Sequence, residues 1–211
     1  MNEVILYDYW RSSAAYRVRI ALNLKGVAYT SIPTSLLKGE QTKPEYVARN
    51  PQGFVPMLCI DGHDLTQSLA IIDYLDANFP EPPMVSGDPA KRAKTLAQAL
   101  VIAADIHPIN NLRILRYLKS RLGHSQAEID EWYRHWIIEG FTALEAMAPG
   151  DDLFGDDHPN LADVCLVPQM YNARRLDTPL DAFPKLVRID GLLSSIPAFE
   201  AAHPDATNPD A

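Results

Sequence analysis

A proline-rich segment near residue 80 divides this 211-residue sequence into two parts with different patterns. Three prolines occur within residues 80–83, and Gly87-Asp88-Pro89 follows shortly afterwards. Proline fixes φ and has no backbone N–H, so prolines at this density exclude a regular helix or strand. We therefore predict one domain at residues 1–80, a linker at 81–89 and a second domain at 90–211.

The first part alternates between strand and helix patterns. An apolar run at residues 4–8 predicts a buried strand, and residues 13–24 show the apolar spacing of a helix. Gly26 stands where a helix would end in a left-handed residue, and residues 29–34 alternate as a strand does. This order predicts a βαβ unit with a right-handed crossover.

A hairpin and a second helix are predicted to complete this domain. Apolar residues 57–60, the turn signal Asp61-Gly62 and residues 63–66 fit two antiparallel strands, and an amphipathic helix capped by Ser68 follows. Pro56 stands at the entrance of the hairpin, where its missing N–H is tolerated. A cis bond before Pro56 would leave the main chain of Val55 open to a ligand. A trans bond, the commoner isomer, would only mark a sheet edge.

The second part is predicted to be all-helical. Apolar residues recur at spacings of three and four from residue 89 to about 122, and again from 129 to 147. Pro108 lies inside the first pattern, so we predict a kinked helix in which the carbonyl of Ala104 is released. Such a kink inside the polar stretch 105–113 is unusual for a helix that serves only the core.

The remainder of this part contains a capping signal and two helix ends. Asn160 and Asp163 fit a variant of the capping box, which we assign to folding. Arg174-Arg175 ends that helix, where cations suit the helix dipole. A last helix is predicted near residues 185–202, interrupted at Pro197, and residues 206–211 are expected to be a frayed tail.

Two adjacent hydroxyls, Ser12 and Ser13, stand where the first strand turns into the first helix. The first N–H groups of a helix lack internal partners and carry partial positive charge, so they stabilise an anion, including a thiolate. A serine before a helix is also a common N-cap, and these residues alone leave both roles open. Ser68 repeats the arrangement at another helix, where a ligand carboxylate could bind.

Charge and composition exclude several classes of partner. The formal net charge of −8 disfavours nucleic acids and anionic membranes, and no apolar run approaches the roughly 20 residues that span a bilayer. The N-terminal Met-Asn-Glu lacks the features of a signal peptide. Cys59 and Cys165 lie in apolar segments and are predicted to be buried free thiols, without a disulfide or a metal site. We expect a cytoplasmic protein.

Taken together, these motifs resemble the zeta class of glutathione transferases, the family that includes maleylacetoacetate isomerase. The resemblance covers nearly the whole chain and is carried by Arg11-Ser12-Ser13, residues 17–22, Asn50-Pro51, Val55-Pro56, residues 67–72 and residues 161–169. It implies the glutathione transferase fold, which is an α/β thioredoxin-like domain (βαβ-ββα) followed by an all-α domain.

Ala14 departs from the pattern of this class, whose members usually carry cysteine after the two serines. The similar bacterial maleylpyruvate isomerases also lack that cysteine, and they share a run that resembles residues 105–111. The departure therefore leaves the activity class unchanged and puts the choice of substrate in doubt.

The resemblance implies a glutathione-dependent cis–trans isomerase that converts maleylacetoacetate to fumarylacetoacetate in aromatic amino-acid catabolism, with transferase side activity. The alternative substrate is maleylpyruvate. A homodimer is expected, and no metal. The implied roles are catalysis for Ser12, Ser13 and Arg11, glutathione binding for Gln52, Val55, Gln67, Ser68, His107 and Asn111, and binding of substrate carboxylates for Arg11, Arg113 and Arg175.

Other classes of function share some of these residues. A general detoxifying transferase, or a relative that binds ligands without turnover, would carry much of this signature. Glutathione affinity without catalysis would identify the second of these. A thioredoxin-like disulfide reductase would need a reactive cysteine near the first helix, and Ala14 occupies the usual place.

Overall fold

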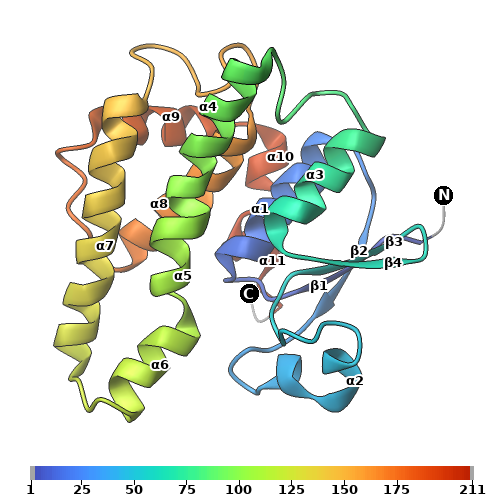
Figure 1. Cartoon of the computed structure of the whole chain (residues 1–211), viewed down its shortest axis with the longest axis vertical. Coiled ribbons are helices and arrows are strands. Elements are labelled where there is room, and N and C mark those ends of the chain that lie inside the picture. Colours follow the sequence, from blue (N-terminus) through green and yellow to red (C-terminus); the bar gives the residue numbers. More distant parts are fainter. Residues whose placement is uncertain (1–2, 210–211) are drawn as a thin grey trace. The chain divides into compact units, whose positions relative to one another are not determined.

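The computed structural model describes residues 3–209 and divides into two compact units (Figure 1). The first unit comprises the chain up to Met84 together with the residues from Ser195 onward, and the second comprises Val85–Ser194. The residues of the predicted linker, 81–89, are thus divided between the two units, and the C-terminal segment lies in the first one.

A four-stranded mixed sheet in the order β2-β1-β3-β4 forms the centre of the first unit. β1 (Ile5–Asp8) pairs in parallel with β2 (Thr30–Pro33) through helix α1 (Ser13–Leu24), which confirms the βαβ order. β3 (Met57–Ile60) runs antiparallel to β1 and to β4 (His63–Thr66), which confirms the hairpin. Gly62, with φ of 81°, makes its left-handed turn.

Helices α1 and α3 (Ser68–Asn78) pack together, and Figure 1 shows both on one face of the sheet. Between these helices and the sheet lies an apolar core that includes the fully buried side chains of Leu6, Ile20, Leu58 and Ile71. A short 3-10 helix (Glu40–Thr42) and α2 (Pro44–Val47) connect β2 to the loop before β3. Gly26, with φ of 64°, follows the end of α1 as predicted.

Residues 80–84 belong to the first unit because a buried lysine holds them. The ammonium of Lys25 donates to the carboxylate of Asp76 at 2.7 Å and to the carbonyl of Pro82 at 2.6 Å. The same Asp76 oxygen accepts from the backbone N–H of Met84 at 2.7 Å. These bonds hold Pro82 and Met84 against the ends of α1 and α3, and the first unit extends to Met84.

The C-terminal segment packs against α1 through α10 (Pro197–Glu200). The side chain of Asn23 donates to the carbonyl of Ala198 at 2.9 Å, and Phe199 is buried. The expectation of a frayed tail from residue 206 is wrong for residues 206 and 207, because they belong to α11 (Pro204–Thr207), which is a helical turn. His203 caps that turn by accepting from the Asp205 N–H at 3.2 Å; residues 210–211 lie outside the described part.

The second unit is built from helices, as predicted. They are α4 (Pro89–Leu100), the π-helical turn η2 (Val101–Ile106), α5 (His107–Ile109), α6 (Leu112–Ser120), α7 (Gln126–Met147), α8 (Leu161–Arg175) and α9 (Pro184–Ser194). Within residues 3–209, none of the helices has the length and apolar character that crossing a membrane requires.

The prediction of one kinked helix around Pro108 is wrong in its detail. The chain forms the π-helical turn η2 directly before α5, which contains Pro108, and α5 and α6 are separated by Asn110 and Asn111. A π turn inside a helix is rare and is found frequently at functional sites. Gly140 of α7 makes room for this turn, because a Cβ there would come within 2.4 Å of the Ile106 side chain.

The capping box of α8 is confirmed. The side chain of Asn160 accepts from the N–H groups of Ala162 and Asp163 at 2.8 and 3.2 Å. Asp163 accepts in return from the N–H of Asn160 and also from Phe154 and Gly155, at 2.9, 3.1 and 2.9 Å. Burial nevertheless raises the pKa of Asp163 to about 6.

Candidate active site

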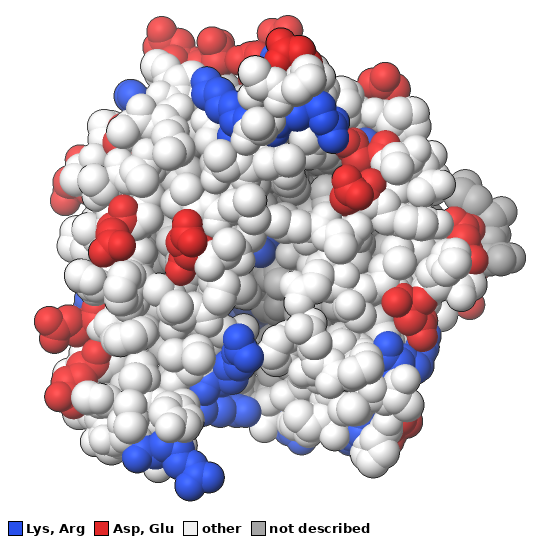
Figure 2. Space-filling model, in the orientation of Figure 1, with Lys and Arg blue, Asp and Glu red and all other residues white. Residues whose placement is uncertain are grey.

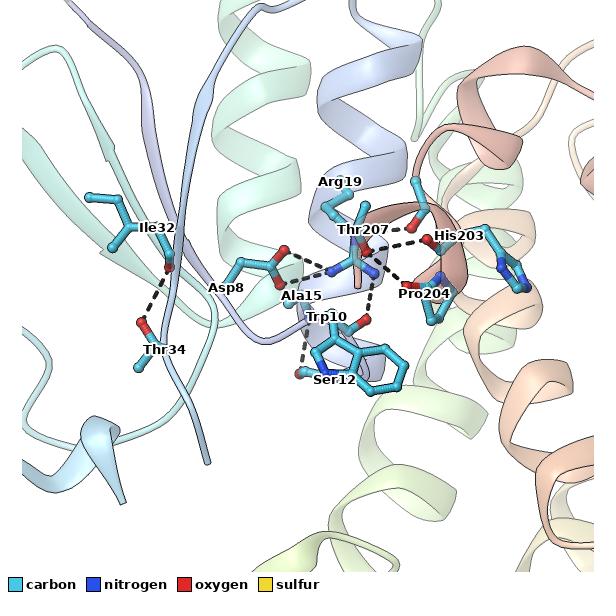
Figure 3. Close-up of polar contacts among 11 residues, drawn as sticks. Asp8, Trp10, Ser12, Ala15, Arg19, Ile32, Thr34, His203, Pro204 and Thr207 are labelled. Atoms are coloured by element: carbon cyan, nitrogen blue, oxygen red, sulfur yellow. Dashed lines mark hydrogen bonds and ion pairs between the residues drawn. The ribbon is translucent and has the colours of Figure 1, made fainter. Parts of the chain in front are cut away.

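Ser12 is the N-cap of α1. Its hydroxyl oxygen accepts from the N–H of Ala15 at 3.3 Å (Figure 3). The N–H of Ser12 donates to the carbonyl of Tyr9 at 2.8 Å. The capping role that the sequence left open is therefore confirmed. Because the cap uses only a lone pair of the oxygen, the hydroxyl hydrogen can still be donated to a ligand. Ser13 is the first residue of α1 and is buried.

Arg19 anchors the loop that carries Ser12, a role that sequence reasoning missed. One guanidinium nitrogen donates to both carboxylate oxygens of Asp8 at 2.8 and 2.9 Å, and the other terminal nitrogen donates to the carbonyl of Trp10 at 2.9 Å (Figure 3). Its Nε donates to the carbonyl of Ala202 at 3.0 Å. Arg19 thus ties the end of β1, the loop before α1 and the C-terminal segment together.

The Arg19–Asp8 pair lies in the interior of the first unit. Arg19 is fully buried and Asp8 is 4% exposed. Burial raises the pKa of Asp8, and the charge and hydrogen bonds of Arg19 lower it in part. The pattern that could have revealed this anchor is an arginine on the apolar face of a helix, combined with an aspartate at the end of a buried strand.

Arg11 lies next to Ser12 in the chain and is half-buried. Its guanidinium carbon is 5.3 Å from the centre of the Trp10 ring, a distance typical of a cation–π contact. This contact holds the charge at the N-terminal end of α1.

The loop before β3 is pinned by side chains on both sides. Asn50 is buried, donates to the carbonyl of Phe54 at 2.7 Å and accepts from the N–H of Gln52 at 3.2 Å. The hydroxyl of Tyr46 donates to the same carbonyl of Phe54 at 2.6 Å. Gly53 takes a left-handed φ of 61° inside this loop.

The bond between Val55 and Pro56 is cis, which answers the question of the isomer that the sequence left open. The main-chain N–H and C=O of Val55 have no hydrogen-bond partner among residues 3–209. A main chain in this state can pair with an extended peptide, as in strand addition.

Gln67 and Gln52 come from different segments and meet. The amide nitrogen of Gln67 donates to the amide oxygen of Gln52 at 2.6 Å. Gln67 also has φ of 67° and ψ of 115°, an unfavourable region for a residue other than glycine. Such backbone strain is concentrated at functional sites.

The prediction that Ser68 caps α3 is wrong. Gln67 is the N-cap residue, no side chain caps the helix, and Ser68 is its first residue. The buried hydroxyl of Ser68 accepts instead from the guanidinium of Arg17 at 3.3 Å. The N-terminal N–H groups of α3 are therefore left without a side-chain cap, the condition in which a helix end binds a carboxylate.

In the second unit, the predicted residues His107, Asn111 and Arg113 lie on or beside α5 and α6. His107 begins α5, and Asn111 is the N-cap of α6, where its side-chain oxygen accepts from the N–H of Arg113 at 3.1 Å. Arg113 is exposed in the first turn of α6. The capping role of Asn111 was not predicted, and it leaves the amide nitrogen of that side chain available to donate.

Arg174 and Arg175 end α8 as predicted, but their surroundings differ. Arg174 is paired with the buried carboxylate of Asp190 at 2.6 Å. Arg175 is exposed and donates to the side chain of Asn172 at 3.5 Å. Burial raises the pKa of Tyr133, and the charge and hydrogen bond of Arg175 lower it. Arg174 is therefore part of the fold, whereas Arg175 stands at a polar position open to a ligand.

The two cysteines are free, as predicted, but only Cys165 is buried. Cys59 is partly exposed, and Arg49, at the start of the loop before β3, places a guanidinium nitrogen 2.7 Å from its sulfur. Burial raises the pKa of Cys59 to about 11, so its thiol is protonated at neutral pH. Neither cysteine is thus a suitable nucleophile, and no cluster of three metal-binding side chains occurs in the described chain.

Comparison with known proteins agrees with this arrangement. A family model described as the glutathione S-transferase N-terminal domain matches residues 6–83. The chain is 49% identical to a maleylacetoacetate isomerase of Rhizobium meliloti over 212 residues, covering 99% of both chains.

Solved structures extend the similarity to the whole fold. The holo structure of a maleylpyruvate isomerase, described as a bacterial zeta-class glutathione S-transferase, superposes with a TM-score of 0.95 at 40% identity, covering 98% of this chain and 100% of that one. A maleylacetoacetate isomerase of Anaeromyxobacter dehalogenans with glutathione bound in its active site superposes with a TM-score of 0.88 at 39% identity, covering 99% and 98%.

Proposed function

Because the chain belongs to the zeta class of glutathione S-transferases, we propose that it is a glutathione-dependent cis–trans isomerase of a maleyl dicarboxylate. The observation that carries the proposal in the first unit is the contact of Gln52 with Gln67 in the loop and helix that flank the open main chain of Val55. Transferase activity toward other electrophiles is expected as a side reaction.

The residues of the first unit suit glutathione, which is a peptide with two carboxylates. The open N–H and C=O of Val55 can pair with its central cysteine residue, as two strands pair. The uncapped N-terminus of α3, together with Gln67 and Ser68, can hold the γ-glutamyl carboxylate. Gln52 would lie along the peptide. From the second unit, His107 and Asn111 are proposed to contribute donors to the same ligand.

The hydroxyl of Ser12 is proposed to donate to the sulfur of glutathione, with Ser13 and Arg11 supporting it. When bound, glutathione supplies a thiolate that adds reversibly to the double bond, so that the bond can rotate. A thiol with a pKa near 8.5 is only about 3% ionised at pH 7, whereas a pKa lowered by about two pH units leaves it mostly ionised. One hydroxyl donor and the N-terminus of α1 can supply such a shift.

The maleyl substrate is a dianion and requires cations in this acidic chain. Arginine offers permanent charge and a forked geometry that matches a carboxylate. We propose that Arg11, Arg113 and Arg175 bind the two carboxylates. Arg175 is the best supported, because it is exposed beside Tyr133 and Asn172 while its neighbour Arg174 is used by the fold.

Maleylacetoacetate is the first candidate substrate and maleylpyruvate the second. The second is supported by Ala14, since the bacterial maleylpyruvate isomerases lack the cysteine that other zeta enzymes carry there, and by a maleylpyruvate isomerase of Ralstonia that is 42% identical over 97% of this chain. Two other functions are the alternatives to an isomerase: a general detoxifying transferase, and a relative that binds ligands without catalysis.

We also propose that the protein is a cytoplasmic homodimer. Leu96 and Leu100 lie one turn apart on α4 and are 38% and 42% exposed, as expected of an apolar helix face that a second copy covers. Light scattering at micromolar concentration would give a mass near 47 kDa for a dimer, twice the 23.5 kDa of the chain. A mass of one chain at that concentration would exclude this assembly.

The function is tested by measuring turnover of maleylacetoacetate and of maleylpyruvate with and without glutathione. We expect isomerisation of at least one substrate and strict dependence on glutathione, because the chain's own cysteines are unsuitable nucleophiles. Activity that survives complete removal of glutathione would contradict the proposal. Glutathione binding without any turnover would identify the non-catalytic relative.

A further inference from the structure

A long segment of this acidic chain carries only positive charge. Residues 106–127, from η2 into the first turn of α7, contain four lysines and arginines and no aspartate or glutamate. At the chain's overall density of 27 acidic residues in 211, a segment of this length would carry about three. The nearest carboxylates along the chain are Asp105 and Glu128.

The four cations are exposed on α6 and the residue that follows it. We call Arg113, Arg116, Lys119 and Arg121 the basic surface of α6. Figure 2 shows Lys and Arg side chains gathered at the lower end of the visible face, where Figure 1 places α6, without acidic side chains among them. Elsewhere on the surface, the exposed cation of Lys91 is paired with the carboxylate of Asp156 at 2.8 Å.

Lys119 and Arg121 form the outer half of the basic surface of α6, and no carboxylate forms an ion pair with either of them among residues 3–209. Lys119 donates to the neutral amide oxygen of Gln126 at 3.1 Å. Glu128, the nearest acid beyond them, is held in the capping box of α7 by the N–H of Ser125 at 2.7 Å. Gln126 in turn donates to the carboxylate of Asp130 at 2.9 Å, so its amide stands between Lys119 and that carboxylate. Lys119 and Arg121 thus carry charges that no carboxylate pairs with directly in the part of the chain that the structure describes.

We propose that the basic surface of α6 attracts the dianionic substrate toward Arg113 before it binds. This inference rests on the function proposed above and adds Arg116, Lys119 and Arg121 to it as long-range steering charges. Lys119 and Arg121 stand up to about 12 Å from Arg113 along the chain, at about 1.5 Å per residue. A small dicarboxylate bound at Arg113 does not reach them, so their effect must act through space.

The net charge of the chain and the range of electrostatic forces favour steering of the substrate by the basic surface of α6. A net charge of −8 repels a dianion on average, which lowers its concentration at the surface. A local cluster of positive charges attracts the dianion instead and can raise its rate of encounter with the protein by about 10-fold or more. Charges about 12 Å apart interact well at 10 mM salt, where the Debye length is about 30 Å, and weakly at 300 mM.

The test reverses the two outer charges and follows the dependence on salt. We would measure kcat/KM of Lys119→Glu/Arg121→Glu for the maleyl substrate that the wild-type protein turns over, from 10 to 300 mM ionic strength. The matched control is Lys38→Glu/Lys94→Glu, which changes the net charge equally at exposed lysines outside the basic surface. Conjugation of a neutral electrophile is measured in parallel.

If the inference is right, the α6 variant loses about tenfold in kcat/KM at 10 mM and less than about twofold at 300 mM. Its kcat and its activity on the neutral electrophile stay at wild-type values, and the control changes much less. A loss that is equal at every salt concentration, an equal loss in the control, or no loss at all overturns the inference while the proposed function stands. Absence of turnover in the wild-type protein overturns both.

Discussion

Arg19 of α1 and Asp8 at the end of β1 form a buried ion pair with oxygen–nitrogen distances of 2.8 and 2.9 Å, and their side chains are 1% and 5% exposed. The pair joins the sheet to the helix whose N-terminus is proposed to bind sulfur. The same guanidinium also holds the carbonyl of Trp10, two residues before Ser12. The position of Ser12 therefore depends on a charge that lies in the core.

Replacing one partner of this pair should be strongly destabilising. Arg19→Met leaves the carboxylate of Asp8 buried and unpaired, and we expect the free energy of unfolding to fall by about 3–5 kcal/mol. Chemical denaturation monitored by circular dichroism measures this change. Lys91→Met is the matched control, because Lys91 and Asp156 are half-exposed and solvent screens the attraction in such a pair, so a much smaller loss is expected. Equal losses in the two variants would refute the assignment.

The order of elements was predictable because its signals are local. Proline density, the Asp61-Gly62 turn and the capping pair of α8 act within a few residues, and the structure confirms what each predicted. Ser68 and Arg19 were not predictable in the same way. Their roles depend on partners 51 and 183 residues away, and a serine before a helix carries no local sign that an arginine of another helix occupies its hydroxyl.

The candidate site also combines residues that were predicted with roles that depend on partners distant in the sequence. The resemblance identified Gln52 and Gln67, and the structure brings their side chains into contact. It treated Arg175 on the same footing as Arg11 and Arg113, and only the pairing of Arg174 with Asp190 shows which of two adjacent arginines is engaged in the fold. The sequence could not determine the isomer of the Val55–Pro56 bond, which is cis, because tertiary context decides between cis and trans.

Ser12→Ala should raise the apparent pKa of bound glutathione more than Ser13→Ala does. A hydrogen bond to a charged group contributes about 1.5–3 kcal/mol, which corresponds to about one to two pH units for the thiolate. Ultraviolet titration of the thiolate in the complex measures this pKa directly. Ser12→Thr is the control, because it keeps both the hydroxyl and the N-cap. A titration of Ser12→Ala identical to wild type would leave Ser12 with the capping role alone.

Stability should fall as pH rises from about 4 to 6 because of Asp163. Its pKa is raised from 3.8 in the unfolded chain to about 6 in the folded protein, so within this range the folded state holds the proton more tightly. The unfolded state then binds fewer protons, and the free energy of unfolding decreases with pH by about 3 kcal/mol in total. Asp163→Asn should be less stable throughout, since it loses capping acceptors, and should lack this slope. Parallel curves for the two proteins between pH 4 and 6 would contradict the prediction.

The last prediction uses the two arginines at the end of α8 as a matched pair. If Arg175 binds a carboxylate of the substrate, Arg175→Ala should raise KM for the maleyl substrate by about 10- to 100-fold, because a charged hydrogen bond contributes about 1.5–3 kcal/mol. Its affinity for glutathione and its conjugation of a neutral electrophile should stay near wild-type values. Arg174→Ala should show the opposite profile, because it leaves the buried carboxylate of Asp190 without its partner at 2.6 Å. It should lose stability in denaturation experiments while its KM changes little. If both variants keep wild-type kinetics on the dianion, Arg175 is a helix-terminal charge, and the protein is better described as a general glutathione transferase.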